Sequence, residues 1–116
     1  MNEARHVSTS IDRPPAEVYN YVVQPENLPH WAAGLDSLDD IELRFVGRND
    51  LGVLDHIVTL PSGVEVLNPV RVLPNGAGSE IVFTVFRLPG TSAEAFEADV
   101  AAVARDLETL RGLLER

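Results

Sequence analysis

What the chain lacks excludes several classes of protein. Its 116 residues include no cysteine, which excludes disulfides, thiol nucleophiles and thiolate metal sites. No apolar run approaches the ~18 residues that a membrane-spanning helix needs. Residues 1–10 are largely polar and do not have the basic and apolar regions of a secretion signal. We therefore expect a cytoplasmic protein without a membrane span.

Positive charge is also scarce. Nine basic residues stand against 18 acidic ones, which gives a formal net charge of −9. A surface of this kind repels phosphate backbones and anionic lipids, so we expect no nucleic-acid partner. His6, His30 and His56 lack zinc-site spacing, and the sequence contains no phosphate loop, dinucleotide fingerprint or G-x-S-x-G motif. We expect neither a metal ion nor a cofactor.

The hydrophobic pattern predicts one domain over residues 1–116 that begins with a strand and continues as an antiparallel meander. Apolar and polar residues alternate with period two over residues 4–11, and again over 41–45, 54–60, 64–73 and 79–88. Turn residues, and no helical pattern, separate the last four segments. Asn68 and Pro69 interrupt the segment 64–73, where a proline cannot donate to a strand ladder. We expect a bulge, a bend or a sheet edge there, and a curved sheet as its consequence.

Three helical segments complete the prediction. Prolines open and close a short helix over residues 16–23 and start a second short helix over 25–31. A capping box from Thr91 to Glu94 predicts the start of a long C-terminal helix that ends near Leu114. Its apolar residues recur every three or four positions and form one stripe: Phe96, Val100, Val103, Leu107, Leu110 and Leu114.

Two motifs in the first third of the chain carry a family resemblance. The chain has Ile-Asp-x-Pro-Pro-x-x-Val over residues 11–18 and Pro-Glu-x-x-x-x-Trp over residues 25–31. With the order of the predicted elements, these motifs resemble the START-like helix-grip (SRPBCC) superfamily. Within that superfamily the chain is most similar to the bacterial polyketide cyclase/dehydrase and lipid-transport group.

The resemblance implies an α+β fold with an apolar cavity. A curved antiparallel sheet, here of about five strands, wraps around the long C-terminal helix, and two short helices follow the first strand. Members of the superfamily bind lipids, polyketides or other hydrophobic ligands, and some catalyse ring closure or dehydration. Typical members have about six strands after the short helices, whereas only four are predicted here. The cavity is therefore expected to be small, or filled by side chains.

Several side chains on the expected inner faces are candidates for the site, and each has a structural alternative. His56 is a candidate acid–base group, or a buried neutral histidine held by a backbone carbonyl or a polar neighbour. Asn68 is a candidate for orienting a ligand, or for satisfying backbone groups freed by Pro69. Arg87 is a candidate for an anionic headgroup at the mouth, or for reaching into water or pairing with acids of the last helix. The residues expected to bind ligand are Trp31, Leu54, His56, Val58, Asn68, Val70, Phe83, Val85, Arg87, Phe96, Val100 and Val103.

The sequence thus leaves three functional hypotheses open. The first is a protein, monomeric or weakly dimeric, that binds a small hydrophobic molecule between the sheet and the C-terminal helix. The second is a cyclase or dehydratase with His56 as the acid–base residue. The third is an interaction or regulatory module with a filled core, because a fold does not determine a function.

Overall fold

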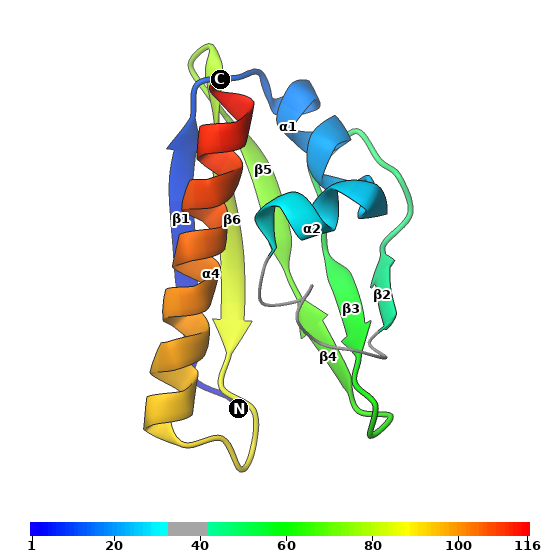
Figure 1. Ribbon diagram of the computed structural model, residues 1–116, viewed down its shortest axis with the longest axis vertical. Helices are drawn as coiled ribbons and strands as arrows, with labels where there is room; N and C mark the ends of the chain where they lie inside the picture. The colour runs from blue at the N-terminus through cyan, green and yellow to red at the C-terminus, as the bar shows by residue number, and fades with distance from the viewer. Residues whose placement is uncertain (33–41) are drawn as a thin grey trace.

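The structure, a computed structural model, describes residues 1–32 and 42–116. In Figure 1, α4 lies along β1 and β6, while β2, β3 and β4 diverge toward the other side of the molecule. The elements in chain order are β1 (Ala4–Ile11), α1 (Pro15–Val22), the 3₁₀ helix η1 (Pro25–Asn27), α2 (Leu28–Trp31), β2 (Glu42–Phe45), β3 (His56–Thr59), β4 (Glu65–Asn68), β5 (Val70–Asn75), β6 (Gly78–Phe86) and α4 (Ala93–Leu114). The predicted α+β architecture is confirmed.

The strands form two three-stranded antiparallel sheets, β1-β6-β5 and β2-β3-β4. The segment 64–73, predicted as one strand, is divided at Pro69, so that β4 belongs to one sheet and β5 to the other. Proline has no N–H to continue the ladder, which is the physical reason for the break. The predicted interruption is confirmed, but the predicted count of about five strands is wrong. Among the described residues there are six strands.

Hydrogen bonds around this break hold the two sheets together. The Leu54 backbone N–H donates to the carbonyl of Val70 at 2.8 Å, and that of Thr84 donates to the carbonyl of Pro69 at 2.9 Å. Asp55 accepts from the backbone N–H of Val70 at 2.9 Å and from both Nε and Nη2 of Arg71, at 3.0 and 2.8 Å. The hydrogen bond from Arg71 is the main reason why the pKa of Asp55 is lowered. Asp55 therefore acts as a clamp between the sheets.

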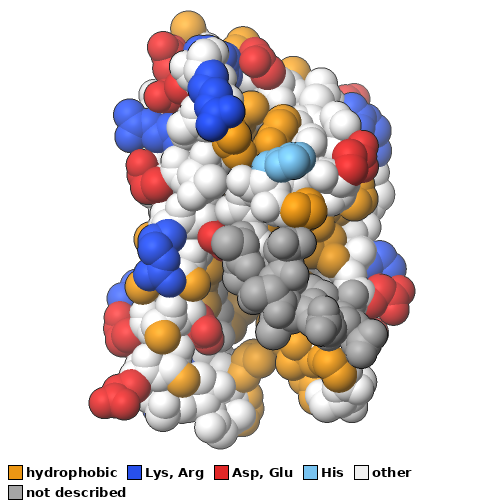
Figure 2. Space-filling view, in the orientation of Figure 1, with side chains coloured by type: hydrophobic (Ala, Val, Ile, Leu, Met, Phe, Trp, Pro, Cys, Tyr) orange, Lys and Arg blue, Asp and Glu red, His pale blue; other side chains and the backbone are white. Residues whose placement is uncertain are grey.

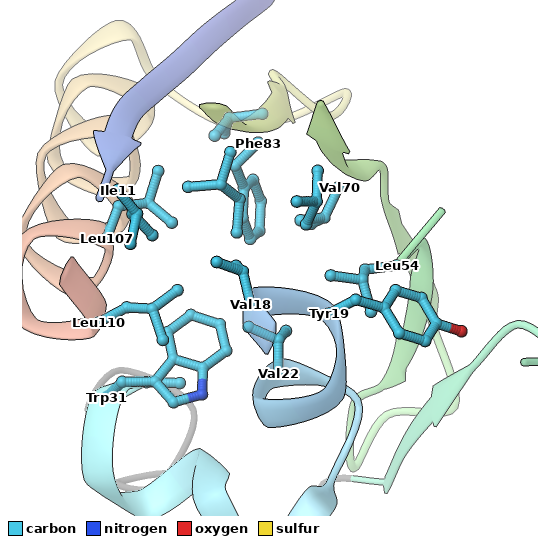
Figure 3. Packing of buried hydrophobic residues seen from close by; sticks show 14 of the residues in the cluster. Ile11, Val18, Tyr19, Val22, Trp31, Leu54, Val70, Phe83, Leu107 and Leu110 are labelled. Atoms are coloured by element: carbon cyan, nitrogen blue, oxygen red, sulfur yellow. The ribbon is translucent and has the colours of Figure 1, made fainter. Parts of the chain in front are cut away.

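The hydrophobic core lies between the sheets, α4 and the two short helices. Figure 3 shows part of this cluster, with Val18 and Val22 of α1 facing residues of the strands and of α4. Phe96, Leu107 and Leu110 of the α4 stripe are buried, and the rest of the stripe is partly buried against the core. The prediction that one apolar face of the C-terminal helix packs on the sheet is confirmed.

The start of α4 corrects one detail of the sequence analysis. Ser92, not Thr91, is the N-cap, and its side-chain oxygen accepts from the backbone N–H of Ala95 at 3.1 Å. Both residues carry a hydroxyl, and the cap is the one that has extended backbone angles immediately before the helix. The helix ends at Leu114, as predicted. Among the helices of the described chain, no segment is both long and apolar enough to cross a bilayer.

Candidate functional site

A small cavity lies where α4 and α2 meet the separating sheets. Its volume is about 60 Å³, and its walls come from α2, β2, β3, β4, β6 and α4. A single buried water needs a cavity of ~10–15 Å³, whereas the pockets of drug-sized ligands have volumes of ~300–1,000 Å³. The cavity as it stands therefore holds a few waters or a small group. Its lining residues are Leu28, Trp31, Ala32, Phe45, His56, Asn68, Phe83, Val103, Asp106 and Leu107.

His56 is the buried titratable residue of this wall, with 3% of its surface exposed. Its Nδ1 lies 3.2 Å from the carbonyl oxygen of Leu54, which only an N–H can satisfy. Its ring also packs edge-on against Phe45 and Phe83, with centroids 5.3 and 5.9 Å away. Burial lowers the pKa of His56, so the imidazole is neutral at pH 7. The structure therefore agrees with the buried, neutral histidine that was one of the two interpretations of this residue.

Asn68 completes the polar part of the wall. It is paired with His56 across the β3–β4 ladder, and its side-chain Nδ2 lies 3.4 Å from His56 Nε2. Because His56 Nδ1 is the donor, Nε2 is an acceptor and the amide N–H of Asn68 donates to it. Within the described part of the chain, Asn68 Oδ1 has no hydrogen-bond partner, and the amide does not bond the backbone around Pro69. The amide oxygen of this lining residue thus remains available for a hydrogen bond.

Trp31 anchors α2 in the core with 4% of its surface exposed. In Figure 3 its indole lies in the same cluster as Leu110 and Val22. Its Nε1 is buried and has no hydrogen-bond partner among residues 1–32 and 42–116. A buried donor without a partner costs about 1–3 kcal/mol.

Not all of the residues expected at the site lie at the cavity. The structure brings Trp31, His56, Asn68, Phe83 and Val103 together in its walls. The others are not among its lining residues: Leu54, Val58, Val70, Val85 and Phe96 are buried elsewhere, and Val100 is partly buried.

Arg87 also lies away from the cavity. Its Nε donates to the carbonyl of Thr91 at 2.9 Å, and its Nη1 is 3.5 Å from the carboxylate of Glu3. This arginine therefore ties the end of β6 to the N-terminal residues and to the turn before α4. Its carboxylate partner comes from the start of the chain rather than from the last helix.

Sequence reasoning missed two lining residues that bear on chemistry, Asp106 and Phe45. Asp106 follows Val103 by three positions, so it lies on the same side of α4 as the apolar stripe. A carboxylate three residues after an apolar residue of the stripe was the feature of the sequence that could have identified Asp106. Phe45 alternates with Arg44 in the first strand of the meander, which put it on an apolar face without showing what that face covers. In the described residues, no three His, Asp or Glu side chains form a cluster that could hold a metal ion.

A larger surface groove, of about 650 Å³, lies outside the core between α1, β5 and the loop before β3. Its polar groups bind each other: the Tyr19 hydroxyl accepts from the backbone N–H of Asn49 at 3.0 Å, and Arg48 bonds the side-chain oxygen of Asn20. The Arg48 guanidinium also lies 5.5 Å from the centre of the Tyr19 ring. Since these contacts occupy several of the groove's own polar groups, the cavity between α4 and the sheets is the stronger candidate site.

Comparisons with known proteins show the fold. No protein-family model matches the sequence, and no curated protein matches it. A protein from Mesorhizobium loti matches in structure with a TM-score of 0.74 and 14% identity, over 98% of both chains. Ara h 8.0201 matches with a TM-score of 0.66 and 12% identity, again over 98% of both chains. A protein encoded in the dynemicin biosynthetic locus matches with a TM-score of 0.76 and 14% identity, over 99% of this chain and 48% of its own.

The chain therefore has the α+β fold of these solved structures, which is the helix-grip architecture that its motifs and element order predicted. Antiparallel strands pack against a long C-terminal helix, and two short helical elements follow the first strand. The identities are low, so the likeness establishes the architecture and leaves the ligand to be argued from the cavity.

Proposed function

We propose that this protein binds a small, mainly apolar molecule in the cavity between α4 and the two sheets. The observation that carries this proposal is a mainly apolar cavity with a few polar groups in its wall. Asn68 contributes an amide oxygen that has no hydrogen-bond partner in the described chain, and Asp106 contributes a carboxylate. Apolar walls with a few convergent polar groups are typical of small-molecule sites.

The cavity has to enlarge to admit most organic ligands, and the split sheet makes this possible at low cost. β4 and β6 form no ladder with each other; the backbone bond from Thr84 to Pro69 joins them at the break. The walls beyond Pro69 can therefore move apart without losing strand-to-strand hydrogen bonds. Figure 2 shows the surface hollowed between the start of α4 and the β3–β4 turn, with hydrophobic side chains on both sides.

One structural neighbour supports a small organic ligand in particular. It is encoded in the dynemicin biosynthetic locus, and this chain matches about half of its length. A biosynthetic context favours small organic molecules over proteins as ligands of this fold. The combination of this likeness with an apolar cavity favours binding over the hypothesis of an interaction module with a filled core.

A catalytic role for His56 remains the second hypothesis. In its favour, His56 is neutral and lies in the cavity wall, so its Nε2 could accept a proton from a bound molecule. Against it, the carbonyl of Leu54 holds Nδ1 and the amide of Asn68 occupies Nε2. Turnover of a bound polyketide-like compound by the wild type, and its loss in His56→Ala with binding retained, would establish this role.

Tryptophan fluorescence tests the binding proposal directly, because Trp31 is the single tryptophan and lines the cavity. We expect small aromatic probes such as phenols and naphthols to shift the Trp31 emission and to raise the melting temperature of the protein. Val103→Phe fills the cavity and should abolish the shift. Val100→Phe, on the same helix but outside the lining, should preserve it. An emission that stays constant at millimolar concentrations of every probe would rule the proposal out.

A further inference from the structure

The cavity wall has a marked bias in charge. Among the described lining residues, one side chain is formally charged at neutral pH, the carboxylate of Asp106. None of the nine arginines, all of which lie in the described ranges, lines the cavity, and the chain has no lysine. The protein as a whole carries a formal charge of −9. A ligand that enters therefore meets a negative potential both at the surface and inside.

Six of the nine arginines pair with carboxylates on the surface, and none of the nine lines the cavity as a partner for an acidic ligand. Arg5 binds Glu97 at 2.6 Å, and Arg71 binds Asp55 at 2.8 Å. Further arginines that pair with carboxylates are Arg13, Arg44, Arg87 and Arg111. A carboxylate or phosphate in the cavity would thus lie beside Asp106 without a counter-ion, which is costly away from bulk water.

The remaining groups of the wall suit a cation. The rings of Trp31, Phe45 and Phe83 line the cavity, and the faces of aromatic rings attract ammonium groups. Asp106 and the amide oxygen of Asn68 offer acceptors for N–H donors. A carboxylate has about four acceptor positions, so Asp106 can bind a ligand while it keeps contacts with the protein.

His56 does not reverse this bias. Its Nδ1–H is directed to the carbonyl of Leu54, and its Nε2 is an acceptor toward Asn68. Burial lowers its pKa, so it adds no positive charge to the wall at neutral pH. Asp55, the nearest carboxylate in sequence, is held by Arg71.

We propose that the ligand of this cavity is an amine-bearing aromatic or alicyclic molecule, whose ammonium group binds Asp106 and whose apolar part packs against Trp31 and Phe83. This inference rests on the proposed function and narrows it. Of the ligands that the fold accommodates, it selects organic cations and excludes fatty acids and other anionic lipids.

Three probes with one hydrocarbon body and different head groups test the inference: 2-phenylethylamine, 2-phenylethanol and 3-phenylpropanoate. Titrations of the full chain at pH 7 would follow the Trp31 emission. We expect the amine to bind at least tenfold more tightly than the carboxylate, with the alcohol between them. Asp106→Asn should weaken the amine about tenfold and leave the alcohol unchanged.

Asp99→Asn is the matched control, because Asp99 is exposed on the same helix and its substitution changes the net charge equally. It should leave the order of affinities as in the wild type. Binding of the alcohol or carboxylate as tightly as the amine would overturn the inference and leave the proposed function standing. An amine affinity that Asp106→Asn does not change would also overturn it. Binding of none of the three probes would overturn both.

Discussion

Burial of His56 makes the stability of this protein depend on pH in the range where an ordinary histidine titrates. The unfolded chain takes up a proton at His56 near pH 6.5, whereas desolvation lowers the pKa of the folded state below that value. Between the two pKa values the unfolded state binds more protons, so the free energy of unfolding rises with pH. The stability that neutral His56 contributes is complete above pH 6.5 and is lost as the pH falls through the folded pKa.

The size of the effect has a ceiling of about 1.4 kcal/mol per pH unit, because one proton is involved. The carbonyl of Leu54 and the charge of Asp55 oppose desolvation, which keeps the slope below that ceiling. Protonation also turns His56 Nε2 into a donor that faces the amide nitrogen of Asn68. We therefore expect a loss on the order of 1 kcal/mol between pH 7.5 and 5.

Urea unfolding at pH 7.5, 6 and 5, followed by circular dichroism, measures this loss. His56→Gln removes the titrating group, so the free energy of unfolding should change much less over the same range. His30→Gln removes an exposed histidine and should keep the wild-type slope. The pKa values of Asp55 and Glu115 are lowered from the ordinary carboxyl range, so their contributions are lost only at more acidic pH. A wild-type slope in His56→Gln would refute the reasoning.

Two further predictions compare matched pairs of substitutions by urea unfolding. Gly52 has φ +74°, and a Cβ there would lie 2.2 Å from the carbonyl oxygen of Val72, so Gly52→Ala should cost more than about 2 kcal/mol. Gly63→Ala, with φ +88° but open space, should cost only about 1–2 kcal/mol, and equal losses would contradict the clash. Ser92→Ala should cost about 1 kcal/mol because it removes the cap of α4, whereas Thr91→Ala should cost less than half of that. A larger loss of stability in Thr91→Ala than in Ser92→Ala would indicate that Thr91 is the N-cap.

Much of the fold could be predicted from the periodicity of hydrophobic residues and from the positions of prolines and turn residues. The stripe of α4, the strand alternation and the prolines around the short helices are local patterns, and the structure follows them. The division of the strand at Pro69 was predictable as an interruption but not as a transfer between two sheets. That outcome depends on partners distant in sequence, such as Thr84 and the clamp between Asp55 and Arg71.

The sequence predicted which side chains face inward at the candidate site, but not which of them line the cavity. Alternation placed His56 and Phe83 on inner faces, and the structure sets them beside each other in the cavity wall. The same alternation selected Leu54 and Val70, which pack into the core instead. Alternation distinguishes inside from outside, and only the tertiary arrangement decides which inner residues meet empty space. Asp106 was missed because a charged residue on a helix is ordinarily read as belonging to its solvent side.

Pro69 both weakens the sheet and opens the space between the strands. An interrupted ladder gives up a backbone hydrogen bond, which is worth about 0.5–1.5 kcal/mol net. The charge-assisted bonds from Arg71 and Val70 to Asp55 offset that loss beside the break. The strands beyond the break separate, and Asn68, the residue before the proline, faces His56 at the edge of the opening. A continuous strand would pair β4 with β6 and close the space that we propose for the ligand, so the residue that weakens the sheet is also the one that makes room for a site.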